Sequence, residues 1–301
     1  MTAMPEVRGT LRRDVSLAPL TWLRVGGPAE WLFQPADLED LAAFMARLGS
    51  DTPLLPVGVA SNLLVRDGGI PGVVVRLGGA LARVVAEDDL IIAGGGALDQ
   101  RVAQVARTAG LAGLEFLIGI PGTVGGAVRM NAGAFGGETT DRLVWVEGID
   151  RSGALRRLAT AELGMRYRAS SLPPDMIVVR AAFRGVPGDH DRIGQRMEAI
   201  REEREAAQPL RVATGGSTFK NPPGEKAWQL IDRAGCRGLR LGAAMVSEKH
   251  CNFLVNLGGA TAAELEALGE TVRQRVHATS GVWLDWELVR VGRPAPAEAR
   301  A

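Results

Sequence analysis

The sequence has few cysteines and no long apolar run, and each scarcity excludes a class of protein. Its two cysteines, Cys236 and Cys251, cannot form a disulfide framework, and together with three histidines they show no spacing typical of a metal site. The longest uncharged apolar stretch near the middle, 116–128, is too short to span a bilayer and contains Pro121. No apolar run follows the arginines of 1–14, so we see no signal peptide and expect a protein of the reducing cytoplasm, without membrane insertion.

Neither sign of charge dominates the sequence. The 35 Lys and Arg residues are balanced by 34 Asp and Glu residues, which leaves a net charge of +1. Such a balance gives no bulk field for nucleic acid or an acidic membrane, so we expect no nucleic-acid partner, and no obligate protein partner is evident. With 46% hydrophobic and 23% charged residues, the chain has an ordinary globular composition and enough length for two or three domains.

Glycine, by contrast, is abundant, with 39 residues among 301, well above its usual share of about 7%. Many of the glycines gather in four clusters that also contain short polar donors. Glycine lets the backbone approach closely, so that amide N–H groups can reach an anion such as a diphosphate. The candidate cofactor-binding residues of these clusters are Gly58, Ser61, Asn62, Gly94, Gly95, Gly119, Pro121, Gly122, Thr123, Gly125, Gly126, Asn131, Ala132 and Gly133.

A single glycine loop is more often a tight turn than a binding site, but four clusters within 56–134 favour a binding site. None of them matches the G-x-x-x-x-G-K-[ST] pattern of a P-loop, which makes a P-loop nucleotidase a poor candidate. None fits the G-x-G-x-x-G fingerprint of a Rossmann domain either. A dinucleotide held by several dispersed loops is left open.

Strand and helix patterns alternate irregularly along the first part of the chain, without the steady rhythm of a doubly wound sheet. Asp37 is expected to cap a helix, and Gly110 to end another. The expected strands are 30–33, 54–57, 73–77, 90–93 and 176–183, the expected helices have apolar faces over 38–48 and 98–109, and a hairpin is expected to join 143–149 to 154–158.

The pattern breaks at 187–189, and we place a domain boundary near residue 187. A charged helix with a narrow apolar face follows the break, and a capping-box pair, Thr261 and Glu264, precedes a later helix. The segment 282–289 alternates apolar and polar residues and predicts a strand. The tail 293–301 is expected to be disordered.

Three further segments carry side chains suited to catalysis. They contain Arg168, Ser217 after two glycines, and Glu287 on the polar face of the predicted strand 282–289. Taken singly, each has a simpler interpretation as a surface cation, a turn residue and a solvated carboxylate. No histidine lies near Ser217 in the sequence and no G-x-S-x-G elbow exists, so a hydrolase-type serine is not indicated.

Together, these motifs resemble those of the UDP-N-acetylenolpyruvoylglucosamine reductase family, also called UDP-N-acetylmuramate dehydrogenases. The resemblance rests on GVASNLL followed by VRDGG in 58–69, on IPGTVGGA in 120–127 and on NAGA in 131–134, and it extends over about 21–292. It implies an α+β fold in which 1–186 form a vanillyl-alcohol-oxidase-type FAD-binding region of two α/β subdomains, split near residue 75. Residues 187–292 would then form an α+β substrate-binding domain. Val59 and Ala60 depart from the glycines that the family commonly has in the first loop.

The resemblance also implies roles for individual residues. Arg168 matches the catalytic arginine of a Y-R-x-S motif, Ser217 the proton-donating serine of G-S-x-F-K-N, and Glu287, not Asp285, the catalytic glutamate near the C-terminus. A second substrate-binding segment matches 243–256. The implied substrate-binding residues are Tyr167, Lys220, Asn221, Lys249 and His250.

The implied cofactors are FAD and NADPH, and the implied substrate is the enolpyruvyl ether of UDP-N-acetylglucosamine, which is reduced to UDP-N-acetylmuramate for peptidoglycan synthesis. Hydride from flavin N5 would reach the methylene carbon, and negative charge would develop beside the substrate carboxylate. Arg168 would stabilise that charge, and Ser217 would protonate the neighbouring carbon. Glu287 would orient these groups or manage protons.

One tyrosine and the absence of Cys and His from the glycine loops refine this interpretation. The family has a longer subclass in which a loop tyrosine closes over the nucleotide, and here Tyr167 of the Y-R-x-S motif is the only tyrosine. We therefore expect the shorter subclass, with a more open uridine pocket. A related flavin oxidase with covalently attached flavin is an alternative that the loops do not favour. A glycine-rich binding or scaffold module is another, and it predicts a colourless protein.

Overall fold

The computed structural model describes residues 4–296, which form two compact units. Unit 1 comprises 1–13, 31–58 and 72–204, and unit 2 comprises 14–30, 59–71 and 205–301. Both units are therefore discontinuous in the sequence. The end of the predicted disordered tail, 297–301, lies outside the described residues.

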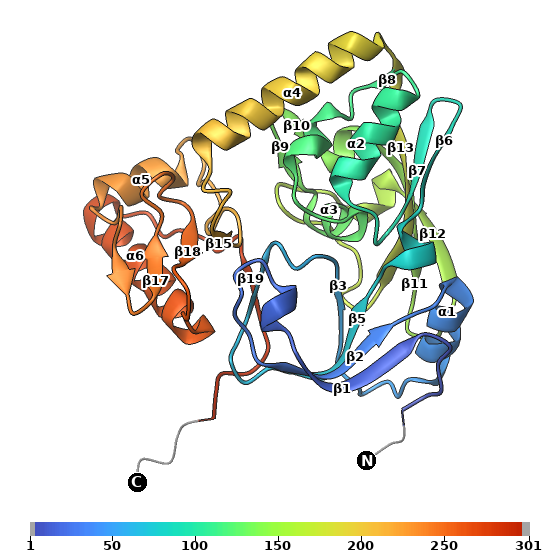
Figure 1. Ribbon diagram of the computed structural model, residues 1–301, viewed down its shortest axis with the longest axis horizontal. Coiled ribbons are helices and arrows are strands. Elements are labelled where there is room, and N and C mark those ends of the chain that lie inside the picture. The colour runs from blue at the N-terminus through green and yellow to red at the C-terminus, as the bar shows by residue number, and fades with distance from the viewer. Residues whose placement is uncertain (1–3, 297–301) are drawn as a thin grey trace. The chain divides into compact units, whose positions relative to one another are not determined.

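Unit 1 combines two larger β-sheets and two two-stranded ones, β10-β9 and β14-β8, with helices (Figure 1). One larger sheet has the strand order β1-β2-β5-β3 and the other the order β12-β11-β13-β7-β6. The main elements are β1 (Thr10–Ser16), β2 (Pro28–Gln34), α1 (Leu38–Arg47), β3 (Leu54–Val57), β5 (Ile70–Arg76), β6 (Val84–Glu87), β7 (Leu90–Gly94), α2 (Asp99–Thr108), β8 (Leu111–Ala112), α3 (Val124–Met130), β9 (Gly133–Ala134), β10 (Gly137–Glu138), β11 (Leu143–Ile149), β12 (Leu155–Ala159), β13 (Ile177–Arg184), β14 (Val186–Pro187) and α4 (His190–Ala207). The chain passes into the other unit within β1, β2, β5 and α4.

Strand β13 lies at the centre of the larger sheet and divides the core of unit 1. Val178 packs into an apolar cluster with α2, α3 and α4, whereas its neighbours Ile177 and Val179 pack with α1. Side chains of a strand point alternately to its two faces, so one strand serves both cores. The predicted capping of α1 is confirmed, since the Asp37 side chain accepts a hydrogen bond from the Asp40 amide. The predicted hairpin is also confirmed by the antiparallel pairing of β11 with β12.

Unit 2 contains a small antiparallel sheet with the order β15-β18-β17-β16, and β4 pairs in parallel with β19. Its elements are β4 (Leu63–Val65), β15 (Ala213–Thr214), α5 (Ala227–Arg233), β16 (Arg240–Leu241), β17 (Ala244–Val246), β18 (Leu254–Asn256), α6 (Ala262–Ser280) and β19 (Val289–Val291). The predicted capping box of Thr261 and Glu264 is confirmed at the start of α6.

The predicted strand 282–289 is wrong over most of its length, because only Val289–Val291 form a strand. The expected alternation is nevertheless present, with Leu284 and Leu288 buried. The preceding segment makes single, irregular hydrogen bonds to the chain around Thr218, and an isolated bridge joins Trp286 to Phe219. Alternating burial thus arises here without a regular ladder.

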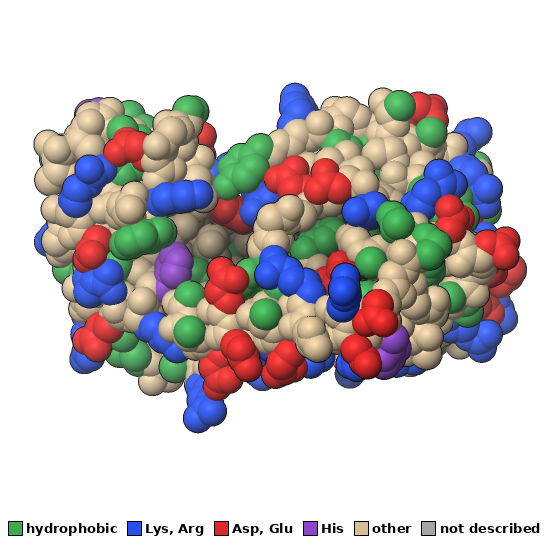
Figure 2. All heavy atoms as spheres, turned by 90° about the horizontal axis from the view of Figure 1, so that it is seen from above, with side chains coloured by type: hydrophobic (Ala, Val, Ile, Leu, Met, Phe, Trp, Pro, Cys, Tyr) green, Lys and Arg blue, Asp and Glu red, His purple; other side chains and the backbone are tan. Residues whose placement is uncertain are grey.

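The surface carries charges of both signs. On the face drawn in Figure 2, Lys and Arg side chains are interspersed with Asp and Glu, in keeping with the net charge of +1. None of the helices in 4–296 is long and apolar enough to cross a bilayer.

Candidate active site

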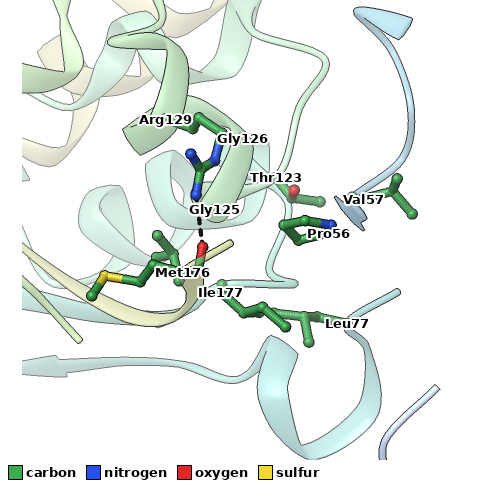
Figure 3. A pocket seen from close by; sticks show the side chains of 12 residues that line it. Pro56, Val57, Leu77, Thr123, Gly125, Gly126, Arg129, Met176 and Ile177 are labelled. Carbon is green, nitrogen blue, oxygen red and sulfur yellow. Dashed lines mark hydrogen bonds between the residues drawn. The ribbon is translucent and has the colours of Figure 1, made fainter. Parts of the chain in front are cut away.

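A pocket in unit 1 collects residues from several of the predicted glycine clusters (Figure 3). Its cavity volume of about 60 Å³ lies below the range of about 300–1,000 Å³ that encloses a whole ligand, so this pocket holds only part of a larger one. Five predicted cofactor-binding residues, Gly58, Gly95, Thr123, Gly125 and Gly126, line it. The other lining residues are Pro56, Val57, Leu77, Arg129, Met176, Ile177 and Val178.

The glycines of this pocket are required for two different reasons. A Cβ atom on Gly95 would lie 1.9 Å from the Val178 carbonyl oxygen, so the fold itself excludes a side chain there. A Cβ atom on Gly126 would have no neighbour closer than the Thr123 hydroxyl, at 3.8 Å. Gly126 thus leaves pocket space empty that packing does not require, which fits a bound ligand that approaches the backbone closely.

Not every amide of the glycine loops is available to a ligand. The Val124 and Gly125 N–H groups donate to the Ala97 and Gly95 carbonyls, both at 2.9 Å. These bonds hold the start of α3 against the loop after β7, so they shape the pocket wall. Thr123 offers a hydroxyl group beside them, which makes no hydrogen bond to any residue in 4–296.

Arg129 places a cation in the pocket wall, although no sequence motif distinguished it. Its guanidinium donates to the Met176 carbonyl at 2.6 Å, as drawn in Figure 3, and to the Pro173 carbonyl at 3.1 Å. Burial lowers the pKa of Arg129 from its very high ordinary value, and an arginine remains protonated after such a shift. The pocket therefore combines a positive charge with apolar walls, a composition suited to an anionic group attached to a flat ring.

The loop 119–122 supports the pocket from outside it, although Gly119, Pro121 and Gly122 were expected to bind the cofactor. A Cβ on Gly119 would clash with the Phe135 ring at 2.3 Å, and one on Gly122 would lie 2.6 Å from the Asp99 carboxylate. Gly94 is likewise packed against a backbone carbonyl, that of Leu81. Close packing explains these glycines without a ligand.

Asp99 is buried completely under this loop, at the start of α2. Neither of its carboxylate oxygens has a hydrogen-bond partner in the described part of the chain. Burial raises the pKa of the Asp99 carboxyl well above its ordinary value, so the neutral acid is favoured there.

Asn131 and Gly133 bond to the turn that holds Arg168 in unit 1, and the Ala132 carbonyl between them accepts from Thr139. The Asn131 side chain, 1% exposed, donates to Glu138 and to the Arg166 carbonyl, both at 3.1 Å, and accepts from the Thr140 amide at 3.0 Å. The Gly133 carbonyl accepts a hydrogen bond from the Arg168 guanidinium at 2.6 Å. These residues support the arginine and do not line the glycine pocket.

Arg168 sits in a tight turn whose backbone is strained. Arg166 and Ala169 exchange hydrogen bonds across the turn, and Arg168 has a φ of 53°, which a side chain other than glycine adopts at a cost. Its side chain is 17% exposed, lies 3.5 Å from Glu138 and stacks over the exposed Tyr167 ring. Strain that the surroundings maintain is common at functional sites, which agrees with a prearranged cation.

In unit 2, the structure brings Ser217 and Glu287 onto adjacent segments. The Glu287 amide donates to the Thr218 carbonyl at 2.8 Å, one residue after the serine. The Ser217 hydroxyl makes no hydrogen bond to another residue of the described chain, and the serine is partly exposed. The predicted proton donor and the predicted glutamate thus lie on neighbouring backbone segments.

The other predicted residues of unit 2 have mixed placements. Asn62 donates to the Glu287 carbonyl at 3.0 Å, and no contact that the structure describes involves the Ser61 side chain. The Asn221 side chain accepts from the Ala227 amide at the start of α5, and Lys249 donates to the Glu205 carbonyl.

Lys220 and His250 differ in how their side chains are used. The Lys220 ammonium group has no ion pair within 4–296. The His250 ring packs against Phe253 with centroids 4.7 Å apart, and burial lowers its pKa, so the neutral ring is favoured at pH 7. No group of three or more His, Cys, Asp or Glu in the described chain could hold a metal ion.

Comparisons with known proteins cover both halves of the chain. A family model described as an FAD binding domain matches residues 29–159, and one described as the C-terminal domain of UDP-N-acetylenolpyruvoylglucosamine reductase matches residues 208–291. A reductase of that name from Acidiphilium cryptum is 58% identical over 297 residues, which are 99% of this chain and 96% of that protein. The reductase of Methylorubrum populi is 59% identical over 291 residues, or 96% and 94% of the two chains.

A solved structure agrees with these relatives. The UDP-N-acetylenolpyruvylglucosamine reductase of Thermus caldophilus is 39% identical, with a TM-score of 0.81, and the match covers 95% of this chain and all of that one. The α+β fold predicted from the sequence, an FAD-binding domain followed by a C-terminal reductase domain, is therefore confirmed. Since the identity extends over nearly the whole length of both chains, this protein belongs to the UDP-N-acetylenolpyruvoylglucosamine reductase family.

Proposed function

We propose that this protein uses FAD and NADPH to reduce the enolpyruvyl ether of UDP-N-acetylglucosamine to UDP-N-acetylmuramate. The observation that carries the proposal is the nearly full-length match to reductases of that name. The reaction adds one hydride and one proton across a carbon–carbon double bond. We place it in the synthesis of peptidoglycan precursors, in the cytoplasm.

The pocket of unit 1 would hold the cofactor. Bound FAD supplies hydride chemistry, which a protein side chain cannot provide. Gly126 leaves the space that a close ligand needs, the Thr123 hydroxyl can donate a hydrogen bond, and Arg129 supplies positive charge to a phosphate. Leu77 and Ile177 offer apolar surface for a flat ring.

Arg168 would stabilise the negative charge that develops on the substrate carboxylate. A cation held by Glu138 and the Gly133 carbonyl needs little reorganisation when that charge appears. It therefore interacts more strongly with the transition state than with the ground state, which accelerates the reaction.

Ser217 would donate the proton to the carbon beside the substrate carboxylate. A serine hydroxyl is a weak acid, so it can serve only when the accepting carbon is a strong base and a nearby cation stabilises the alkoxide. Lys220, three residues along the chain, is the candidate for that cation. Glu287, beside Thr218, would orient the reacting groups or return the proton to Ser217.

The test is a pair of half-reactions under anaerobic conditions. NADPH is added to the purified yellow protein, and bleaching of the flavin absorbance near 450 nm, a generic property of flavins, is recorded by stopped flow. The enolpyruvyl ether is then added, and the colour is expected to return as UDP-N-acetylmuramate forms. A protein that bleaches but does not recover its colour would contradict the proposed substrate.

The related flavin oxidase and the scaffold module are separated by simpler measurements. Acid precipitation is expected to release the flavin into the supernatant, whereas a covalently attached flavin would stay in the pellet. A protein that takes up no FAD on dialysis against it would support the scaffold interpretation.

A further inference from the structure

Asn252 is a buried asparagine that the assigned catalytic groups leave out. It lies between β17 and β18, is 4% exposed, and forms hydrogen bonds to the segment that carries Ser217. Its side-chain oxygen accepts from the Phe219 amide at 3.0 Å, and its side-chain nitrogen donates to the Phe219 carbonyl at 2.8 Å. Its own carbonyl accepts from the Thr218 amide at 2.7 Å.

This pattern makes one side chain act as a strand partner. The Phe219 backbone has one donor and one acceptor, and the planar amide of Asn252 satisfies both, which also fixes the orientation of the amide. Buried backbone groups need such partners, because an unpaired one costs about 1–3 kcal/mol. The regular strand β15 ends at Thr214, so the chain from Ser217 onward depends on these single contacts.

The same short segment is held from its other side by the chain that carries Glu287. The Glu287 amide donates to the Thr218 carbonyl, and the Lys220 amide donates to the Asp285 carbonyl, both at 2.8 Å. Those two bonds join backbone groups, whereas the Asn252 amide belongs to a side chain. A substitution can therefore remove the amide and leave the backbone in place.

We propose that Asn252 is a positioning residue that fixes the Ser217 hydroxyl for proton donation to the substrate. The proposal rests on the proposed function, because it assigns a part to Asn252 only in the protonation step. Asn252 itself touches neither the pocket of unit 1 nor the reacting atoms in this assignment. Losing its amide would move Ser217, and errors of about 1 Å in such positions can cost about a hundredfold in rate.

The chemistry of the amide suggests a substitution whose effect depends on pH. In Asn252→Asp, a protonated carboxyl would still offer one acceptor and one donor to Phe219. The ionised form would instead place a negative charge against the Phe219 carbonyl. Burial favours the neutral acid, so the variant should regain the native geometry as the pH falls. Asn252→Leu, of similar volume, removes both bonds at every pH.

Asn256 supplies the matched control. It is also a buried asparagine, it lies on β18, and its side chain bonds to Leu23, Gly258 and Ala260. Asn256→Asp therefore places a carboxyl in a comparable environment of the same unit, where the side chain makes no hydrogen bond to residues 217–220. It reports any general effect of a buried acid on the protein.

The experiment measures both half-reactions of the FAD-loaded proteins by stopped flow between about pH 6 and 9. For Asn252→Leu we expect flavin reduction by NADPH at the native rate. We expect reoxidation by the enolpyruvyl ether on the order of a hundredfold slower. The solvent isotope effect on reoxidation should increase, because proton transfer becomes limiting. For Asn252→Asp, the reoxidation rate should approach the native rate at low pH and fall as the pH rises, beyond any trend in Asn256→Asp.

Each other result overturns the proposal. Native reoxidation by Asn252→Leu, or a rate profile of Asn252→Asp that runs parallel to that of Asn256→Asp, would show that Ser217 does not depend on Asn252. Equal losses in both half-reactions would show a general structural role. If Asn252→Leu does not fold, the pH profile of Asn252→Asp decides alone. A native protein that fails either half-reaction refutes the proposed function instead.

Discussion

Asp99 offers a test of the buried acid beneath the pocket loop, through the substitution Asp99→Asn. The side chain keeps its size and stays neutral at every pH, while the native carboxyl is fully buried and lacks a partner in 4–296. In the folded protein, burial raises the pKa of Asp99 well above 3.8, the value expected of the unfolded chain. The unfolded state therefore loses its proton first as the pH rises.

The sign and size of the effect follow from this difference in proton binding. Above the unfolded pKa the folded state binds more protons than the unfolded state, so the native free energy of unfolding falls as the pH rises. The slope is about 1.4 kcal/mol per pH unit for one proton, as long as the folded pKa lies above the pH. From about pH 5 upward the asparagine variant should therefore gain stability relative to the native protein, by at most about 1.4 kcal/mol for each pH unit.

Urea unfolding of both proteins, in the presence of saturating FAD, measures this difference at several pH values. The gap between the two free energies of unfolding should be smallest near pH 4–5 and widen toward neutral pH. A gap that is independent of pH would refute the reasoning, because it would mean that Asp99 is ionised in the folded protein and has a partner. Asp150→Asn is the control: hydrogen bonds from Ser152 and Arg156 lower the pKa of Asp150 to about 2, so that variant should lose stability.

Three further substitutions test the pocket, the proton donor and the first loop. Gly126→Ala should fold and gain up to about 1 kcal/mol of stability from helix propensity, yet bind FAD more weakly, whereas Gly95→Ala should unfold more readily because its Cβ would meet a backbone oxygen. Calorimetry measures the stability of each variant and titration measures its affinity for FAD. Tight FAD binding by Gly126→Ala would contradict the pocket assignment. Ser217→Ala should still oxidise NADPH through the flavin while losing UDP-N-acetylmuramate, and normal turnover would exclude Ser217 as the proton donor. Ala60→Gly should raise the free energy of unfolding by roughly 0.5–1 kcal/mol in urea titrations. Ala60 has a φ of 51°, and glycine relieves that backbone strain by more than it adds to the entropy of the unfolded chain. A loss of stability would contradict this.

The sequence revealed the motifs better than it revealed their partners. The glycine-rich loops are visible because glycine is required locally, and Gly58, Gly95, Gly125 and Gly126 do meet in one pocket. Arg129 was missed although it lies between two of those loops, since nothing local distinguishes a buried arginine from an exposed one. The roles assigned to site residues stay predictions, as do the shorter subclass and the contiguous division of the chain at residue 187.

Asn131 shows why side-chain roles are harder to predict than elements. Its place in an N-A-G-A motif suggested a cofactor contact, but its amide groups are used by Glu138, Arg166 and Thr140. Those partners are distant enough in the sequence that only folding identifies them. The same holds for the backbone of 282–288. The alternation of apolar and polar residues is visible in the sequence, but the irregular hydrogen bonding to the chain at Thr218 is not.

The discontinuity of unit 2 has a consequence for synthesis on the ribosome. Residues 59–71 emerge early, yet β4 pairs with β19, and Arg66 binds Glu266, which follows it by 200 residues. Closing so long a loop is slow, so the early segments must wait for the C-terminal residues before their partners exist. Nascent chains that stop before residue 289 should therefore expose β4 and depend on chaperones, even when most of the polypeptide has been made.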